Sequence, residues 1–564
     1  MKYTDKKNVL ELVAVMLRHG ITDIVLSPGS RNAPLLHTFS QHPEFKCYSV
    51  VDERSAAFFG LGLAQQLNKP VAICCTSGSA LLNYAPAVAE AFYQQIPLLI
   101  ISADRPLAWL GQQDGQMLPQ HNALKAVCNY SVQLPEINTQ EERWFCNRLI
   151  NQAILNLYNQ GGTPSHINIP IAEPLYNFTT EVLPEVRIIR KHKPVCDYDA
   201  GEEVKQLQAS GKIWVLCGQM NTDASLTDLL QRFAAQYDAL VISEHTSNLS
   251  GDFVMKQLDA MLYTLTEEEQ TDLAPEIVIS IGGHWVSRRI KQFLRLHTPK
   301  ACWSLQSGDE LKDAFSCLSE VYDMSPTVFL NSLLRNASGK AEGNYATYWN
   351  ERANQLQQAG SLWIQSADYS DLKVIDTLMS RLPMHSFLHL GNSSSVRNAQ
   401  LCNLDASIRV ISNRGVSGID GIVSTTVGFA CETSELVFLF VGDLSFFYDQ
   451  NGLWNKYVKN NLRIVLMNNG SGGIFHLLPG ADKSEAMDGF IACHHQTQAK
   501  EWVLSRGFEY LSASDSEQLD EILETFMNKE SNKPLFLEVF TSAEVNPKVF
   551  KSYYHYIKTL NNGN

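Results

Sequence analysis

Two apolar segments in the last third of the chain are each followed directly by a side chain that could bind a metal ion. Residues 436–441 (LVFLFV) precede Gly442 and Asp443, and residues 462–467 (LRIVLM) precede Asn469 after one further asparagine. Their length and their β-branched and aromatic content predict buried strands. Ligands of open α/β sheets bind at the carboxyl ends of parallel strands. A carboxylate and an amide oxygen meeting there would suit Mg²⁺ held together with a diphosphate.

A second carboxylate, Glu53, lies between a predicted strand at residues 47–51 and a predicted helix at residues 55–64. The helix is apolar nearly all round and should be buried, so a carboxylate beside it is costly unless it has a partner or a chemical role. Glu53 or Asp52 could cap the helix and interact with its dipole. Alternatively, Glu53 could be a general acid or base whose pKa is raised by burial. The residues alone leave both interpretations open.

Arginines follow several of the predicted strands. The loop at residues 27–34 places Ser30 and Arg31 between a strand and a helix, and Arg105 follows a strand at residues 98–102. Arg397 and Arg414 follow predicted strands at residues 387–390 and 409–412. A guanidinium at such a position predicts an anion site, whereas a single surface arginine is more simply a weak ion pair. Four of them at strand ends favour anion binding.

The composition is that of an acidic globular protein. The chain has 564 residues, of which 45% are hydrophobic and 18% charged, and its formal net charge is −14. This length predicts three or four domains, and the net charge argues against a nucleic-acid partner. No apolar stretch is long enough for a transmembrane helix, and no signal peptide is recognisable. The 12 scattered cysteines are expected to be buried free thiols. We therefore predict a cytoplasmic protein without a membrane partner.

Alternating strand and helix patterns divide the chain into three parts, with linkers at residues 181–200 and 336–344. This alternation predicts α/β domains with doubly wound parallel sheets. In the middle part, Gly282-Gly283 follows a strand but no complete GxGxxG motif accompanies it, so a mainly structural role is expected. Cys493-His494-His495 lacks partners at ligand spacing, which argues against a metal site. Helical spacing between the two strands described first predicts a helix that includes Leu453, Trp454, Tyr457 and Val458.

Several short segments together resemble one family of thiamine diphosphate enzymes. They are SPGSR, VDERSAAFFGLG, SADRP, GNSSSVR, SNRGVSGIDG, GDLS and NNGSGGIFHLLPG, and they extend over most of the chain. GD followed by NN is similar to the diphosphate–metal signature of the superfamily, although Leu444-Ser445 stand where most members have a third glycine. The most specific segments resemble the synthases that make 2-succinyl-5-enolpyruvyl-6-hydroxy-3-cyclohexene-1-carboxylate in menaquinone biosynthesis.

This resemblance implies a fold, cofactors and a reaction. The fold would be three α/β domains of the thiamine diphosphate enzyme type: a pyrimidine-binding domain at residues 1–185, a central domain at residues 200–336 and a diphosphate-binding domain at residues 345–564. The cofactors would be thiamine diphosphate and Mg²⁺ or Mn²⁺. The enzyme would decarboxylate 2-oxoglutarate and add the resulting succinyl semialdehyde carbanion to isochorismate in a 1,4-addition. In this superfamily the cofactor lies between two chains, which implies a homodimer with shared active sites and favours a homotetramer.

The matching positions imply roles for individual residues. Glu53 would exchange a proton with the aminopyrimidine ring of the cofactor, and Ile419 would support the bent shape of the cofactor. The metal would be bound by Asp443, Asn469 and the carbonyl of Ser471. The other implied cofactor contacts are Gly391, Asn392, Ser393, Gly442, Leu444, Ser445 and Ile474. The implied substrate contacts are Ser393, Arg397 and Arg414 for 2-oxoglutarate, Ser30, Arg31, Arg105 and Gln116 for isochorismate, and Ile474, Phe475 and Leu478 for an apolar wall.

Arg288 is a further implied substrate contact, at a position where the family leads us to expect a lysine; it keeps the charge but changes the reach of the side chain. Two dianionic substrates require several cations in one cleft of an otherwise acidic protein. The alternative within the superfamily is another carboligase or decarboxylase, such as an acetolactate synthase, but pyruvate has no distal carboxylate for these arginines. A non-catalytic nucleotide-binding protein would not need Glu53, Asp443 and Asn469 together.

Overall fold

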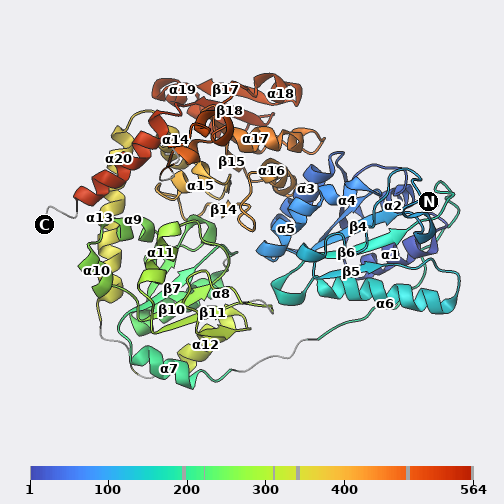
Figure 1. Ribbon diagram of the computed structural model, residues 1–564, viewed down its shortest axis with the longest axis horizontal. Coiled ribbons are helices and arrows are strands. Elements are labelled where there is room, and N and C mark those ends of the chain that lie inside the picture. Colours follow the sequence, from blue (N-terminus) through green and yellow to red (C-terminus); the bar gives the residue numbers. More distant parts are fainter. Residues whose placement is uncertain are drawn as a thin grey trace.

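The computed structural model describes residues 2–192, 198–221, 223–308, 311–337, 339, 343–477, 480 and 483–560. The chain forms three six-stranded sheets, and every pairing between named strands is parallel. In Figure 1 the first sheet and its helices (blue) lie to one side, the second (green) lies below, and the third (orange to red) lies at the top. Three parallel sheets with interleaved helices confirm the predicted fold class. The predicted domain limits stay a prediction.

The first sheet has the strand order β2-β1-β3-β4-β6-β5. Its order changes direction between β1 and β3, so the loops after these two strands lie side by side at the carboxyl edge. The strands are β1 (Asp23–Leu26), β2 (Lys46–Ser49), β3 (Val71–Cys75), β4 (Leu98–Asp104), β5 (Tyr130–Gln133) and β6 (Ser165–Pro170). The helices are α1 (Lys7–Arg18), α2 (Ala33–Gln41), α3 (Glu53–Leu67), α4 (Ser79–Asn83), α5 (Ala85–Gln94) and α6 (Gln140–Asn156).

The second sheet has the order β12-β11-β10-β7-β8-β9, which is the order of dinucleotide-binding sheets. The loop after its first strand nevertheless lacks the glycine-rich motif of those sheets. The strands are β7 (Ile213–Cys217), β8 (Leu240–Ser243), β9 (Val254–Met255), β10 (Ile277–Ile281), β11 (Ala301–Leu305) and β12 (Glu320–Tyr322). The helices are α7 (Gly201–Gln208), α8 (Ala224–Tyr237), α9 (Leu258–Thr264), α10 (Glu267–Asp272), α11 (Arg288–Leu296) and α12 (Pro326–Arg335).

The third sheet, β14-β13-β15-β16-β18-β17, repeats the order of the first. Its strands are β13 (Phe387–Leu390), β14 (Arg409–Ile411), β15 (Val437–Gly442), β16 (Leu462–Asn468), β17 (Glu509–Ala513) and β18 (Leu535–Phe540). Its helices are α13 (Tyr345–Ser366), α14 (Asp371–Met379), α15 (Ser394–Ala399), α16 (Ile422–Ala430), α17 (Asp443–Tyr448), α18 (Lys500–Ser505), α19 (Ser516–Met527) and α20 (Val545–Thr559).

The third-sheet unit shares a hydrophobic core with each of the other two. One continuous core joins the first and third sheets through side chains such as Phe59 of α3 and Val427 of α16. Another joins the second and third sheets, with Trp214 of β7 and Trp349 of α13 buried together. Because burial of apolar surface is the main stabilising contribution to folding, these shared cores fix the three units relative to one another.

Two glycines allow α3 and α16 to pack with their backbones in contact. A Cβ added to Gly62 of α3 would lie 1.9 Å from the carbonyl oxygen of Thr425 on α16. A Cβ added to Gly428 of α16 would lie 2.1 Å from the carbonyl oxygen of Phe59 on α3. Real side chains cannot approach a backbone oxygen so closely, so this crossing requires glycine at both positions. It holds the N-terminal end of α3, where Glu53 lies, against the third-sheet unit.

The structure corrects one sequence prediction. Helix α17 begins at Asp443, and residues 454–459 are not helical. The reason is local, because the side chain of Asn455 donates to Gly452 O and accepts from Tyr457 N, and such bonds compete with helix formation.

The cysteines mostly match expectation. Cys74 and Cys75 on β3 are both fully buried, on opposite faces of the sheet. All 11 cysteines within the described residues are free thiols, and Cys493 among them is exposed. No helix among the described residues is long and apolar enough to cross a membrane.

Replacing Gly428 by alanine tests the helix crossing. The added methyl group would collide with the backbone of α3, so we expect the free energy of unfolding to fall by about 1–3 kcal/mol. Gly211→Ala is the matched control, because a Cβ at Gly211 meets nothing within 4 Å. Urea denaturation of both variants measures the effect, and equal stability of the two variants would contradict the proposed close packing.

Candidate functional site

The order of the third sheet changes direction between β13 and β15, which brings two predicted cofactor loops together. Gly391, just after β13, donates its N–H to Phe440 O on β15 at 2.8 Å. The side chain of Asn392 donates to Asn413 O and Gly418 O, both at 2.7 Å. Asn392 therefore ties the loop after β13 to the loop that carries Arg414 and Ile419. Loops at such a switch point are where open α/β sheets bind ligands.

Ser393 has a strained backbone at this switch point. Its φ is +73° and its ψ is −122°, a backbone conformation that residues other than glycine rarely adopt. It immediately precedes α15, which carries Arg397, and Arg397 donates back to Ser393 O at 2.8 Å. Backbone strain of this kind is concentrated at functional sites, where surrounding contacts hold it in place.

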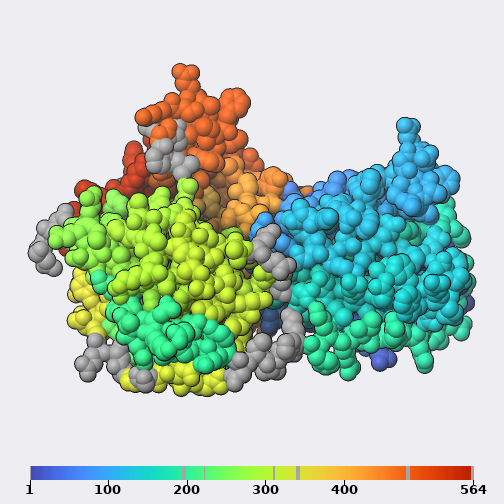
Figure 2. All heavy atoms as spheres, turned by 60° about the horizontal axis from the view of Figure 1, so that its bottom comes forward, coloured from blue at the N-terminus to red at the C-terminus, as the bar shows by residue number. Residues whose placement is uncertain are grey.

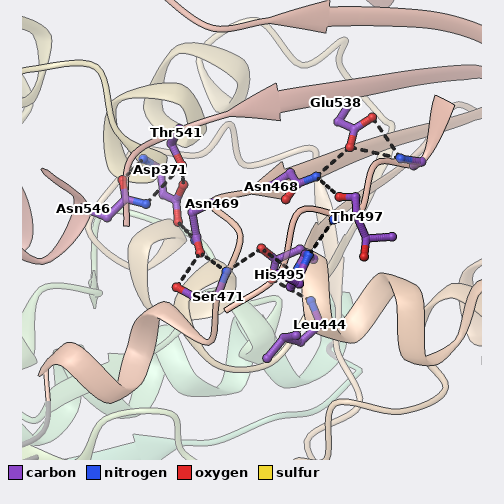
Figure 3. A network of polar contacts seen from close by, with 12 residues as sticks. Asp371, Leu444, Asn468, Asn469, Ser471, His495, Thr497, Glu538, Thr541 and Asn546 are labelled. Carbon is purple, nitrogen blue, oxygen red and sulfur yellow. Dashed lines mark hydrogen bonds and ion pairs between the residues drawn. The ribbon is translucent and has the colours of Figure 1, made fainter. Parts of the chain in front are cut away.

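Asp443 and Asn469 meet at the carboxyl ends of β15 and β16, as predicted; Figure 3 shows Asn469 beside Ser471 at this edge. The N–H of Ser471 lies 3.1 Å from Asp443 Oδ2 and 3.1 Å from Asn469 Oδ1, so the two oxygens lie side by side. The carbonyl of Ser471, the third predicted metal ligand, accepts from Gly473 N at 2.9 Å. The three predicted metal ligands are therefore neighbours in space, although their role as ligands stays a prediction.

The carboxylate of Asp443 is buried, with only 3% of the residue exposed. Burial raises its pKa to about 6, against the lowering effects of Leu444 N–H and of His495. The imidazole of His495 lies beside it, with Nε2 3.5 Å from Asp443 Oδ2. A buried carboxylate that is not matched by a full positive charge is suited to a divalent cation.

A second buried carboxylate, Asp371, fixes the orientation of Asn469 (Figure 3). Asp371 Oδ2 accepts from Asn469 Nδ2 at 3.3 Å, which turns Asn469 Oδ1 toward Ser471 and Asp443. Asp371 is itself held by Thr541 Oγ1, which donates at 2.6 Å, and by Asn546, which accepts from its N–H. Sequence analysis missed Asp371, because its partners are distant in the sequence and nothing in its local segment indicates them.

Glu538 supports the other asparagine of the pair. It is fully buried in β18 and accepts from Asn468 Nδ2 at 2.7 Å, from Ala499 N and from Tyr510 OH. Asn468 thereby fixes the end of β16 from which Asn469 extends. A single carboxylate inside the apolar segment LFLEVF was the signal that could have identified this contact.

The remaining predicted cofactor and wall residues surround this edge. Ile419 is 40% exposed, and its carbonyl accepts a hydrogen bond from Ser445 Oγ. Ile474 and Phe475 lie on the short helix η6 (Gly473–Leu477) and are partly buried. Leu478, the third predicted wall residue, lies outside the described residues.

Glu53 is the first residue of α3 and is partly buried. Asp52 caps this helix, because its Oδ1 accepts from Ser55 N at 3.1 Å, so capping does not account for Glu53. Both neighbours of Glu53 contact the third-sheet unit: Asp52 accepts from Asn451 and Arg54 donates to Tyr448 O. Burial, followed by the charge of Asp52, raises the pKa of Glu53.

Three predicted substrate arginines form one cationic group between the second and third sheets. Burial lowers the pKa of Arg397, and the charges of Arg414 and Arg288 lower it further. Arg414 is 7% exposed, donates from NH1 to Asn392 Oδ1 and has no hydrogen-bond partner for Nε among the described residues. A small cavity of about 20 Å³ is lined by Arg397, Ile474 and Asp371 among others, and Asp371 is the carboxylate that accepts from Asn469.

The four predicted residues of the first-sheet unit form a separate group. Arg31 and Arg105 both act on the carboxyl of Asp104 at the end of β4, whose pKa is raised by burial. Ser30 is exposed in the loop after β1. Gln116 is bound to the loop after β3 through Ser77, whose carbonyl accepts from Gln116 Nε2 at 2.5 Å. These two loops are adjacent at the switch point of the first sheet.

Among the described residues, no hydrogen bond or ion pair joins the first-sheet group to the arginines of the third-sheet unit. In Figure 2 the first-sheet unit (blue) and the third-sheet unit (orange) rise on either side of a hollow. A larger cleft of about 1430 Å³ lies where the three units meet, lined for example by Gln95, Gly283 and Arg409. None of the predicted site residues lines that cleft, so we do not identify it with the candidate site.

Known proteins resemble this chain over its full length. The sequence model of the family "Thiamine pyrophosphate enzyme, N-terminal TPP binding domain" matches residues 7–126. A protein of Phocaeicola vulgatus is 44% identical over 99% of this chain and 100% of its own length. Proteins of Bacteroides fragilis (43%) and Bacteroides thetaiotaomicron (44%) match with the same coverage. All three are named 2-succinyl-5-enolpyruvyl-6-hydroxy-3-cyclohexene-1-carboxylate synthase.

The raised pKa of Asp443 predicts a dependence of stability on pH. The folded protein holds this proton more tightly than the unfolded chain, so the associated stability is lost as the pH rises through about 6. Both proteins are measured in the presence of a chelator. Between about pH 5 and about pH 8, the free energy of unfolding of the wild type should fall by about 1 kcal/mol more than that of Asp443→Asn. Denaturant titrations at the two pH values measure this difference, and parallel pH profiles for the two proteins would show that burial of Asp443 is not costly.

Proposed function

The chain belongs to the family of 2-succinyl-5-enolpyruvyl-6-hydroxy-3-cyclohexene-1-carboxylate synthases, and we propose that it joins 2-oxoglutarate to isochorismate in menaquinone biosynthesis. In this reaction the C1–C2 bond of 2-oxoglutarate breaks and CO₂ leaves. The carbon that was C2 then bonds to the β-carbon of the conjugated alkene of isochorismate, and a proton is taken up. The observation that carries the proposal is that Arg397 and Arg414 donate to the adjacent residues Ser393 and Asn392 at the switch point of the third sheet. The alternative, an acetolactate synthase, acts on pyruvate, which has no distal carboxylate that these arginines could bind.

The Asp443–Asn469 edge fits a divalent cation and a diphosphate. Asp443 Oδ2 and Asn469 Oδ1 lie side by side, and a Cβ on Gly442 would meet nothing within 4 Å, which leaves room beside the carboxylate. Mg²⁺ or Mn²⁺ suits this set of oxygen ligands. When bound, thiamine diphosphate would supply a nucleophilic carbon for the keto group and a cationic thiazolium ring that takes up the electron pair left by departing CO₂. The residues proposed to contact it beside the metal are Gly391, Asn392, Ser393, Leu444, Ser445 and Ile474.

Glu53 is proposed to hold a proton at the ring nitrogen of the cofactor's aminopyrimidine. Its raised pKa favours the protonated carboxyl, which can donate to a ring nitrogen. Its position is supported by the bonds of Asp52 and Arg54 to the third-sheet unit. Ile419 is exposed and lies on a loop that is hydrogen-bonded to Asn392. We propose that its side chain contacts the cofactor and supports its bent shape.

The two arginine groups are proposed to bind the two substrates. Arg397 and Arg414, with Ser393, would hold the distal carboxylate of 2-oxoglutarate, and Arg288 would add to the attraction. Arg31 and Arg105 would bind the carboxylates of isochorismate. Arg105 is paired at 2.6 Å with Asp114, which is half exposed, and an exposed pair of this kind is weak enough to be exchanged for a dianion.

A homodimer, assembled further into a tetramer, is proposed as the working form. The support within this chain is the exposure of Leu107 (70%) and Trp109 (53%) in the segment that follows Arg105. Exposed apolar side chains next to a functional loop are typical of a surface covered by another molecule. Light scattering during size-exclusion chromatography measures the assembly, and a monomer at working concentrations would contradict it.

The proposed reaction is tested by following the loss of isochorismate spectroscopically. We expect loss only when 2-oxoglutarate, thiamine diphosphate and Mg²⁺ are all present. If 2-oxoglutarate is decarboxylated while isochorismate persists, the acceptor is wrong and the cofactor assignment stands. If neither substrate changes and thiamine diphosphate does not bind, both assignments are wrong.

Replacing Glu53 by glutamine tests the proton-transfer role. An amide cannot exchange this proton, so turnover should fall by about 10²–10⁴-fold, while the unfolding midpoint changes little because Asp52 caps the helix. Glu44→Gln, at an exposed position before β2, is the control. Turnover of Glu53→Gln close to that of the control would remove Glu53 from the mechanism.

A further inference from the structure

The residues after β8 contact all three elements that carry the substrate arginines of the cationic group. These residues, 244–248, include the short helix η4 (His245–Ser247) and belong to the second-sheet unit. Sequence analysis assigned that unit no role in the site beyond Arg288. Each of Glu244, His245 and Asn248 binds a different element, and we call this stretch the connector segment.

Glu244 fixes the beginning of α11, the helix whose first residue is Arg288. Its Oε2 accepts from Val286 N at 2.6 Å and its Oε1 accepts from Ser287 N at 2.8 Å. Ser287 in turn caps α11, because its Oγ accepts from Ile290 N. Both oxygens of one buried carboxylate are thus used to hold the turn that immediately precedes Arg288.

His245 fixes the end of α15, the helix that carries Arg397. Its Nε2 lies 3.0 Å from Ala399 O and 3.1 Å from Cys402 O, and its backbone N–H donates to Gln400 Oε1. Burial lowers the pKa of His245 to about 4, so the neutral imidazole donates one N–H to these carbonyls. The last carbonyls of a helix need such donors.

Asn248 fixes β14, the strand that leads to Arg414. Its Oδ1 accepts from Val410 N at 2.6 Å and its Nδ2 donates to Val410 O at 3.0 Å. These two bonds satisfy the backbone N–H and carbonyl of Val410, as a neighbouring strand would. Val410 lies four residues before Arg414. A second residue of the same unit, Gln219, donates to Ser412 O at 2.8 Å and holds the following turn.

The charge of Glu244 also acts on the cationic group. Glu244 is 4% exposed, and burial raises its pKa to about 7 while Arg414 lowers it. Its charge in turn acts on Arg397, Arg414 and Lys291. Asp259, the other carboxylate near Arg397, is already paired with Arg289 at 2.6 Å. The ionised carboxylate of Glu244 therefore offsets part of the repulsion among these cations, while both of its oxygens accept from backbone N–H groups.

We propose that Glu244 is a positioning residue that, through the turn at Val286 and Ser287, sets Arg288 and its neighbouring arginines to receive a dicarboxylate substrate. This inference rests on the proposed function for the identity of that substrate, 2-oxoglutarate. It does not make Glu244 a catalytic residue, since Glu244 lies behind the arginines. It assigns the second-sheet unit a part in substrate binding through residues that do not touch the substrate.

The test is a comparison of Glu244→Gln with wild type in two measurements. Glutamine has only one acceptor oxygen and no charge, so one of the two N–H groups loses its partner. We expect KM for 2-oxoglutarate to rise about tenfold, with kcat changed by less than about threefold. We also expect Kd for succinate, a dicarboxylate that needs no chemistry to be measured, to rise by a similar factor in calorimetry on the full-length protein.

Two further variants separate positioning from general destabilisation. Glu276→Gln is the control. Glu276 also lies in the second-sheet unit and accepts from a backbone N–H, that of Gly211. It precedes β10, however, and so lies at the amino ends of the strands, away from the connector segment. It should lower the unfolding midpoint without changing KM or Kd. If Glu244→Gln does not fold, His245→Leu replaces it, because loss of the bonds to Ala399 and Cys402 should displace Arg397 and raise the same constants.

The outcomes distinguish this inference from the proposed function. If wild type binds succinate but shows no synthase activity, the proposed function is wrong, and the calorimetry still decides the role of Glu244. If wild type is active and neither constant changes in Glu244→Gln, the inference is overturned and Glu244 is only structural. If wild type does not bind succinate at all, the inference is overturned as well.

Discussion

The close crossing of α3 and α16 is the contact on which the arrangement of the candidate site depends. It is possible only because Gly62 and Gly428 have no side chains, and it merges the cores of the first and third sheets into one. Glu53 begins one of these helices, and the loop that carries Ile419 leads into the other. The backbone contact therefore fixes how the first-sheet unit, which carries Glu53, packs on the third-sheet unit, which carries the proposed cofactor loops.

Charge burial is the second constraint. The protein is acidic as a whole, yet the charges of Arg414 and Arg288 are close enough to Arg397 to add to the lowering of its pKa by burial. Asp443 is buried at the carboxyl end of β15, beside the imidazole of His495. Such groups destabilise the ligand-free protein, and the proposed dianion, diphosphate and metal ion would stabilise them. The buried carboxylates Asp371, Glu244 and Glu538 hold these groups in place through hydrogen bonds to amide and backbone N–H groups.

The sequence was informative where function depends on strand ends and uninformative where it depends on distant partners. Asp443 and Asn469 follow recognisable apolar strands, so their meeting at one sheet edge could be predicted, as could the three parallel sheets. The helix predicted around Tyr457 was wrong because Asn455 forms local bonds and Tyr457 packs against Tyr48 of the first-sheet unit. The roles of Asp371 and of the connector segment could not be predicted, since their partners lie far away in the sequence and only the packed units bring them together.

The most direct test of this account is to locate the metal ion. Crystals grown with thiamine diphosphate and Mn²⁺ would show the position of the ion by its anomalous scattering. The account predicts one strong peak between Asp443 Oδ2 and Asn469 Oδ1, with the carbonyl of Ser471 as a further ligand and the diphosphate completing the coordination. A peak elsewhere, or a bound cofactor whose diphosphate does not lie at the carboxyl ends of β15 and β16, would contradict it.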